Sequence, residues 1–481
     1  MKRIPFRPIS RHAVLISLCL FLFSCGSTPI QKPGVQPAAS TLELSRTNII
    51  TAQDYGISGT SLCGGGLLYG WNCASDVCEN IWTARSFKFE AMDMADIDGD
   101  YKREIIGLAG CRMSEYKDKG TEEFYTYFLC VYKEDETKDC DGMGMWRTTY
   151  GDGMKNNLRE NTLWCWWPKE LIIENMDGDD GDEVILSTGH WLAVYKYMPD
   201  EIYDPRKTKG LFKKHVSLQP SVSKQHLRIN SIAAGNVLDP TNKMIVVSAN
   251  REDCKTNMAG LIERSVKNEG YILFFYLRGG RLEMSAELPI NAYLTGCSLR
   301  LGDIDGDENL EIISTGFKYQ KDTCQAYIFI WDFISSWECF EIPIGSPEPC
   351  LPLNQKNPDK SNSPWNHVAV GEILPEYPGC EIVYTLGNQM LVTLCRWTGG
   401  SNLEILQQAT LYDYLSVQPN NIIVADTDEN GINEIIVFGS GKSNPDSGRF
   451  YLEIFNGNLI RKWLRIGGAP NEFGVDCLSV G

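Results

Sequence analysis

Residues 303–314 read DIDGDENLEIIS, and this short stretch decides the fold. Acidic residues occupy its first, third and fifth positions, a glycine holds the fourth, and Glu311 stands at the ninth. Two isoleucines follow the glutamate, and β-branched residues after a polar turn are typical of a strand. The stretch therefore predicts a tight, oxygen-rich loop that leads directly into a β-strand.

The same frame recurs along the chain. It is found at 96–104, at 175–183 and at 426–434, each time followed by aliphatic residues. Two further copies, which begin at Asn236 and Glu372, keep the strands but lose most of the acids. The six starts lie 54 to 79 residues apart, which leaves room for a four-stranded sheet after each loop. A repeat of this length predicts a ring of small sheets.

The two ends of the chain complete the repeat count. Residues 473–481 look like the opening strand of a repeat, whereas residues 57–85 lack such a strand. If both ends share one sheet, the ring closes and no sheet edge stays exposed. We therefore predict an all-β chain with little helix. It forms a single β-propeller, of seven blades with six or eight as alternatives, whose N- and C-terminal strands share one blade.

A family resemblance supports this architecture. The loops, their glycines and the segment Gly468-Ala469-Pro470 with Phe473-Gly474 resemble the FG-GAP/VCBS repeats of integrin α-subunit propellers and of many bacterial surface proteins. The resemblance covers nearly the whole mature chain; four loops match well and two match only in their strands. It implies a propeller with calcium-binding loops on one rim, and it does not imply one particular activity.

The acidic loops suit a hard cation. Calcium takes six to eight oxygen ligands, often from alternating side chains of a tight loop plus one backbone carbonyl, whereas Mg²⁺ demands a compact octahedron. Polar turns are the alternative, but four copies in register favour metal binding. With the resemblance, this spacing predicts up to four structural Ca²⁺ ions. Their ligands would be Asp96, Asp98, Asp100, the carbonyl of Lys102 and Glu104; Asn175, Asp177, Asp179, the carbonyl of Gly181 and Glu183; Asp303, Asp305, Asp307, the carbonyl of Asn309 and Glu311; and Asp426, Asp428, Asn430, the carbonyl of Ile432 and Glu434.

The first residues have the features of an export signal. Four basic residues precede a short apolar run, and the run ends in Leu22-Phe23-Ser24-Cys25, which resembles the lipobox of bacterial lipoproteins. We expect a signal peptide at 1–24, a lipidated Cys25 with a flexible tether at 25–46, and the propeller at 47–481. The protein would then lie in the bacterial cell envelope, at the outer membrane or cell surface rather than the inner membrane, with the lipid as its only anchor.

Charge and cysteine content agree with export. The net charge of −17 argues against nucleic acid as a partner, because phosphates require clusters of lysine and arginine. The chain has 17 cysteines, and thiols in such number outside the cytoplasm predict disulfides. Two pairs, Cys111–Cys130 and Cys380–Cys395, could lie on neighbouring strands of one sheet.

The sequence shows no motif of a known catalytic site and no cofactor-binding motif. It therefore predicts a binding, adhesion or scaffolding module rather than an enzyme, with a protein or polysaccharide partner. Trp164, Trp166 and Trp167 could form its ligand surface, although they could equally pack between blades. The alternative is a carbohydrate-active enzyme such as a calcium-dependent polysaccharide lyase, which a central cleft lined by lysine or arginine would favour.

Overall fold

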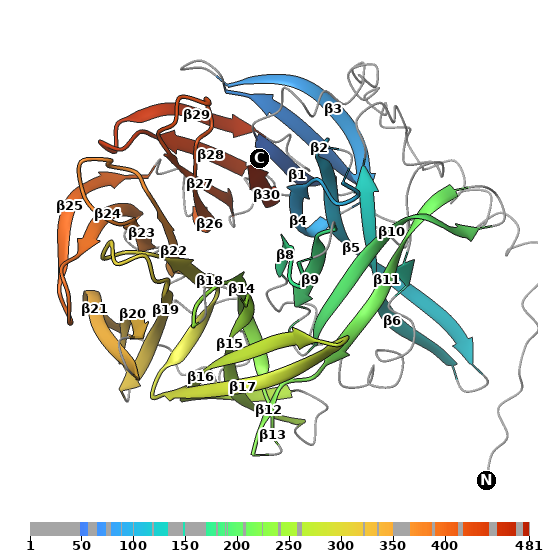
Figure 1. Cartoon of the computed structure of the whole chain (residues 1–481), viewed down its shortest axis with the longest axis horizontal. Helices are drawn as coiled ribbons and strands as arrows, with labels where there is room; N and C mark the ends of the chain where they lie inside the picture. Colours follow the sequence, from blue (N-terminus) through green and yellow to red (C-terminus); the bar gives the residue numbers. More distant parts are fainter. Residues whose placement is uncertain are drawn as a thin grey trace, which may run out of the picture. The chain divides into compact units, whose positions relative to one another are not determined.

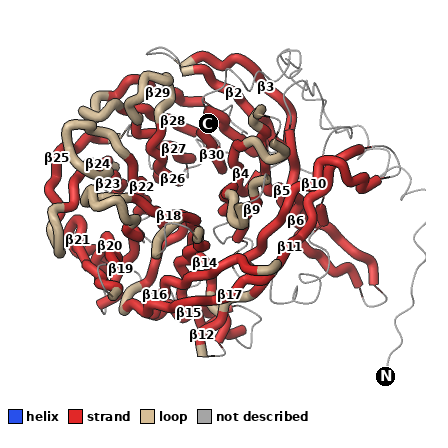
Figure 2. The backbone as a smooth tube through the Cα atoms, in the orientation of Figure 1, coloured by secondary structure: helices blue, strands red, loops and turns tan. Residues whose placement is uncertain are grey.

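The structure, a computed structural model, describes residues 49–480 apart from gaps, and the statements below concern the described residues. The gaps of four or more residues are 56–64, 74–77, 133–147, 150–169, 257–261, 350–365, 412–416, 442–449 and 468–474, and residues 1–48 also lie outside. Every element in the described part is a strand, so the all-β prediction is confirmed (Figure 2). None of these residues forms a helix long and apolar enough to cross a membrane.

Seven four-stranded antiparallel sheets form the blades of a propeller, which confirms the predicted count (Figure 1). The strands that open the blades lie nearest the centre of the ring (Figure 1). In blade order they are β4 (Phe89–Ala95), β8 (Glu170–Glu174), β14 (Arg228–Gly235), β18 (Tyr293–Gly302), β22 (Asn366–Gly371), β26 (Val417–Ala425) and β30 (Val475–Val480). The second strands are β5 (Glu104–Lys117), β9 (Glu183–Ser187), β15 (Met244–Thr256), β19 (Glu311–Gln320), β23 (Glu381–Leu386), β27 (Glu434–Gly441) and β1 (Ile49–Tyr55).

The outer strands follow in the same order. The third strands are β6 (Gly120–Tyr132), β10 (Leu192–Asp204), β16 (Ile262–Arg278), β20 (Thr323–Phe333), β24 (Leu391–Trp397), β28 (Phe450–Phe455) and β2 (Gly65–Asn72). The fourth strands are β7 (Thr148–Thr149), β11 (Thr208–Leu218), β17 (Arg281–Ile290), β21 (Trp337–Pro349), β25 (Leu403–Thr410), β29 (Arg461–Gly467) and β3 (Glu79–Phe87). A two-stranded sheet of β12 (Ser221–Val222) and β13 (Gln225–His226) lies between the second and third blades along the chain.

The seventh blade joins the two ends of the chain, as the sequence predicts. Its strand order is β3-β2-β1-β30, and β30 pairs antiparallel with β1 through the register Ile49↔Val480 to Thr51↔Leu478. Leu478 is buried in a cluster with residues of the sixth blade, and Ile50 is buried in a cluster with residues of the first. The last described strand therefore completes the ring of blades.

Small residues at the end of the opening strands let neighbouring blades approach each other. Gly302 and Gly371 each stand one residue before the start of a repeat, and each faces the side chain of a valine on the opening strand of the next blade. A Cβ atom at Gly371 would lie 2.5 Å from Cγ1 of Val424. Gly302 and Gly371 thus allow close contact between sheets.

We expect the Gly371→Ala variant to unfold more easily, by about 1–3 kcal/mol, because the stiff side chain of Val424 cannot move away without displacing its strand. Chemical denaturation measures the effect. Adding Val424→Ala should recover part of the loss by giving the methyl group room. Strictly additive effects of the two substitutions would contradict the proposed contact.

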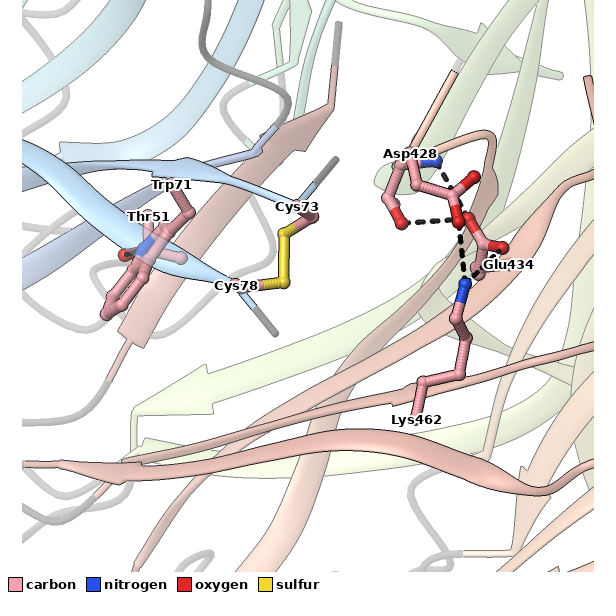
Figure 3. Close-up of a disulfide and its surroundings, with 8 residues drawn as sticks. Thr51, Trp71, Cys73, Cys78, Asp428, Glu434 and Lys462 are labelled. Carbon is pink, nitrogen blue, oxygen red and sulfur yellow. Dashed lines mark hydrogen bonds and ion pairs between the residues drawn. A yellow bond between two sulfur atoms is a disulfide. The ribbon is translucent and has the colours of Figure 1, made fainter. Parts of the chain in front are cut away.

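The two disulfides predicted from the sequence are wrong. Cys380 and Cys395 are free thiols, Cys130 forms no disulfide, and register explains why. Cys111 pairs with Thr126 while Cys130 pairs with Gly107, so the two cysteines are four residues out of step along β5. Cys395 lies opposite Ile382, two residues beyond Cys380. A disulfide within the described residues instead joins Cys73, which follows β2, to Cys78, which precedes β3 (Figure 3).

Candidate metal loops and axial cluster

A buried glutamate opens the second strand of five blades. These residues are Glu104, Glu183, Glu311, Glu381 and Glu434, and each exposes at most 2% of its surface. One carboxylate oxygen of each accepts a hydrogen bond from the backbone N–H that lies seven residues earlier, at 2.8 to 3.1 Å. In the four acidic loops the ninth position is therefore tied to the second position, whereas Glu381, at the tenth position of its loop, accepts bonds from the second and the third.

The first residue of each loop shapes the turn. Oδ1 of Asp303 accepts a 2.7 Å hydrogen bond from the backbone N–H of Gly306, and its Oδ2 accepts a 3.0 Å bond from that of Glu308. Asp96 receives the same two bonds from Gly99 and Tyr101. The fourth and sixth residues have positive φ, as for Gly306 at 82° and Glu308 at 72°. A left-handed backbone favours glycine, which explains the glycine at the fourth position.

Three of the four predicted loops bring carboxylate oxygens together. In each, one oxygen from the first, third and ninth positions lies within 4.8 Å of the others; the groups are Asp96, Asp98, Glu104, then Asp303, Asp305, Glu311, and then Asp426, Asp428, Glu434. In the remaining loop, residues 175–183, Asn175 takes the first position. Its Oδ1 accepts a 2.7 Å hydrogen bond from the backbone N–H of Gly178. Asp100 and Asp179 lie outside the described residues, and the four predicted carbonyl ligands stay predictions.

Carboxylates repel one another most clearly in the loop of residues 303–311. The pKa of Glu311 is raised to about 8, mainly by burial and also by the charges of Asp305, Asp332 and Asp307, against a hydrogen bond from Ile304 that lowers it. The pKa of Asp305 is also raised, by burial and then by Asp307. Acids that raise one another's pKa in this way are stabilised by a cation between them.

A second group of charged side chains lies on the opening strands, away from the loops. Arg300 on β18 directs Nη1 to within 3.5 Å of Oε1 of Glu170 on β8, and its Nη2 donates a 3.3 Å hydrogen bond to Oδ1 of Asn421 on β26. These partners belong to the blades two places away on either side. In a ring of seven blades, a side chain that reaches both must extend toward the axis. Asp93 takes the same place on β4 as Arg300 does on β18, three residues before its loop, and we call Asp93, Glu170, Arg300 and Asn421 the axial cluster.

The carboxylates of the axial cluster are held by neighbouring blades. Oε2 of Glu170 accepts 2.6 Å hydrogen bonds from the hydroxyl of Ser231 and from the N–H of Ile232. Oδ1 of Asp93 accepts a 3.1 Å bond from the hydroxyl of Ser479 on β30. Burial raises the pKa of Glu170, and it raises that of Asp93 to about 6. Glu170 and Arg300 still expose 14% and 24% of their side chains, so the cluster is accessible to water.

Sequence reasoning missed the axial cluster. Asp93 and Arg300 both stand three residues before the first residue of a loop, and Glu170 and Asn421 both stand five residues before one. These positions differ by two and thus lie on the same side of a strand. A charged residue at one of these positions, on a strand otherwise rich in apolar residues, was the sequence signal that could have indicated the cluster.

The pH dependence of stability tests the environment of Asp93. Its pKa of about 6 in the folded protein exceeds the usual 3.8, so stability should fall as pH rises from about 4 to about 6 and stay lower above. At pH 8 the Asp93→Asn variant should be more stable than the wild type by about 2 kcal/mol, and near pH 4 the advantage should vanish. Urea denaturation at both pH values measures this. An equal effect at both would contradict the assigned pKa.

Comparisons with known proteins describe the fold and little else. No protein-family model matches the chain, and no curated protein matches it. Among solved structures, a protein from Lactobacillus plantarum is 10% identical and aligns over 90% of this chain and 98% of its own, with a TM-score of 0.45. The periplasmic gluconolactonase of Pseudomonas aeruginosa is 9% identical over 89% and 97%, with a TM-score of 0.45. A rhamnogalacturonan lyase is 11% identical over 90% and 87%, with a TM-score of 0.31.

The comparisons correct one prediction. The sequence predicts that the chain is not an enzyme, because it shows no catalytic motif, but most of the similar solved structures with a named activity are enzymes, including lactonases, glycosidases and lyases. A search for local motifs does not decide this question, because residues from several blades can meet in a propeller, as Arg300, Glu170 and Asn421 do here. The predicted ligand surface of Trp164, Trp166 and Trp167 lies outside the described residues.

Proposed function

We propose that the protein is a calcium-binding propeller in which ions hold the turns between first and second strands. The shared geometry of three loops carries this proposal, because each brings three carboxylates within 4.8 Å. All of these donors are oxygen atoms, which suits a hard cation such as Ca²⁺. In addition, Oδ1 of Asp428 is buried and receives no hydrogen bond. A cation would supply the partner that this oxygen needs.

Direct measurement of bound metal tests this function. The full chain is stripped with chelator and dialysed against buffered Ca²⁺, and bound metal is measured by elemental analysis. We expect calcium to bind and Mg²⁺ to compete poorly. The Asp303→Asn and Asp305→Asn double variant should lose bound calcium, whereas Glu404→Gln, an exposed residue of β25 that pairs with Arg396, should not. A wild-type chain that takes up no calcium would refute the proposal.

We further propose that the propeller is tethered to the bacterial envelope by a lipid on Cys25. The basic residues, the short apolar run and the cysteine that follows support this. Metabolic labelling with a radioactive fatty acid should mark the wild type and leave Cys25→Ala unlabelled. Labelling of the variant would show that the lipid is attached elsewhere.

The axial cluster favours a second function, a carbohydrate-active enzyme of the polysaccharide lyase type. In such a reaction, Arg300 would bind the carboxylate of an acidic sugar, which makes the neighbouring C–H more acidic. The carboxylate of Asp93 would take that proton, a C=C bond would form, and the glycosidic oxygen would leave with the electron pair and a proton from solvent. Arg300 already has a carboxylate within 3.5 Å, which shows that its position can hold one.

Activity measurements test the lyase proposal. The calcium-loaded full chain is incubated with polysaccharides that contain uronic acids, and unsaturated products are followed by ultraviolet absorbance. We expect Arg300→Gln to raise KM and Asp93→Asn to lower kcat. If neutral glycans bind without cleavage, the axial cluster serves binding and the lyase proposal fails. The lyase proposal also fails if acidic polysaccharides yield only saturated products.

A further inference from the structure

Two lysines approach the metal loops at the same place. Nζ of Lys462 on β29 lies 2.8 Å from Oδ2 of Asp428 and 3.2 Å from Oε1 of Glu434, which are the third and ninth positions of their loop (Figure 3). All three side chains are largely buried, with 17%, 14% and 3% exposed.

The second lysine reaches its loop from a different strand. Nζ of Lys196, on the third strand of its blade, lies 3.6 Å from Oδ2 of Asp177 and 3.5 Å from Oε1 of Glu183. These are again the third and ninth positions. Two lysines on different strands of their blades thus place an ammonium beside the equivalent oxygens of two loops.

The loop of residues 303–311 has the opposite arrangement. In the second blade Lys196 pairs in register with Glu183. In the fourth blade Trp331 pairs with Ile312, so the next residue, Asp332, takes the corresponding place beside Glu311. Asp332 is buried, with 6% of its surface exposed. Within the described residues, no basic side chain forms an ion pair with the acids of this loop.

We propose that the loops of residues 426–434 and 175–183 carry a lysine ammonium as a built-in cation, whereas the loop of residues 303–311 requires calcium and uses Asp332 as an additional ligand. The inference rests on the proposed calcium function and divides its sites into two kinds. Calcium enters the 426–434 loop only by displacing Lys462, because the ammonium and the ion need the same oxygens. The loop of residues 303–311 offers five carboxylates and fills first.

Calcium titration of the full chain by calorimetry tests the lysine half of this proposal. Lys462→Met should raise the calcium affinity of the 426–434 loop by about tenfold or more. Lys318→Met is the matched control, since Lys318 is also 17% exposed and pairs with a carboxylate, Glu341, outside the loops. In chelator, Lys462→Met should melt below the wild type, and calcium should restore it. The Lys318→Met variant should show no such rescue.

The aspartate half has its own variant. Asp332→Asn should weaken the tightest calcium site by about tenfold, while Glu338→Gln, which changes the exposed residue opposite Asp332, should change it far less. If wild type binds calcium but Lys462→Met leaves affinity and rescue unchanged, the lysine assignment is overturned and the calcium function stands. If Asp332→Asn leaves the tightest site intact, the role of Asp332 is overturned. If wild type binds no calcium, the calcium function itself fails.

Discussion

Removing calcium from the full chain is expected to lower its melting temperature markedly. Each site that is saturated at about one hundred times its dissociation constant contributes about 2.7 kcal/mol to stability. Without the ion, carboxylates such as Asp303, Asp305 and Glu311 repel one another in a partly buried loop. The loop connects β18 to β19, so its loosening also weakens the contact of the fourth blade with its neighbours. Scanning calorimetry with and without chelator measures the shift.

The control for this prediction is a chain that has lost the site itself. In calcium, Asp305→Asn should melt at a lower temperature than the wild type. It should also respond less to chelator, because the variant has already lost the stability that calcium gives to this loop. Magnesium in place of calcium should restore little of the melting temperature. If the melting curve of the wild type stays the same in excess chelator, the ions are not structural.

Deleting residues 475–481 is expected to prevent the propeller from folding stably. The deletion removes β30, and with it the register that pairs β30 with β1. It also removes buried Leu478 and the hydrogen bond from Ser479 to Asp93 of the first blade. The exposed edge of β1 would invite pairing with another chain. We expect a loss of more than about 5 kcal/mol, seen as aggregation in size-exclusion chromatography.

Deletion of Gly481 alone is the matched control and should leave the melting temperature unchanged. A Ser479→Ala variant separates the hydrogen bond from the strand and should cost about 1 kcal/mol. A chain that ends at residue 474 and still elutes and melts like the wild type would contradict closure of the ring by β30.

The sequence predicts the architecture well because each local signal agrees with the global fold. The run from Asp303 to Ser314 encodes a loop, a buried glutamate and a strand in twelve adjacent residues, and every such feature is local. Blade number and closure followed from counting these runs. The glutamate at the ninth position was predicted only as a ligand. The structure adds that it binds the backbone of its own loop, as Glu311 binds the N–H of Ile304.

Features that depend on register or on contacts between blades could not be predicted. The predicted disulfides are wrong because a disulfide between paired strands also requires the two cysteines to lie opposite each other. Cys111 and Cys130 lie on paired strands but four residues out of step. The axial cluster joins Arg300 to Glu170 and Asn421, which are 130 and 121 residues away along the chain. Similarly, no spacing rule shows that Lys462 reaches Asp428. Such pairings are set by how whole sheets are arranged.

A crystal structure of the calcium-loaded chain, with calcium located by its anomalous scattering, tests the central claim most directly. The account predicts an ion in the loop of residues 303–311, bound by Asp303, Asp305, Asp307 and Glu311 at about 2.3–2.6 Å. An anomalous map without a peak in that loop, together with acids that point away from one another, would contradict it.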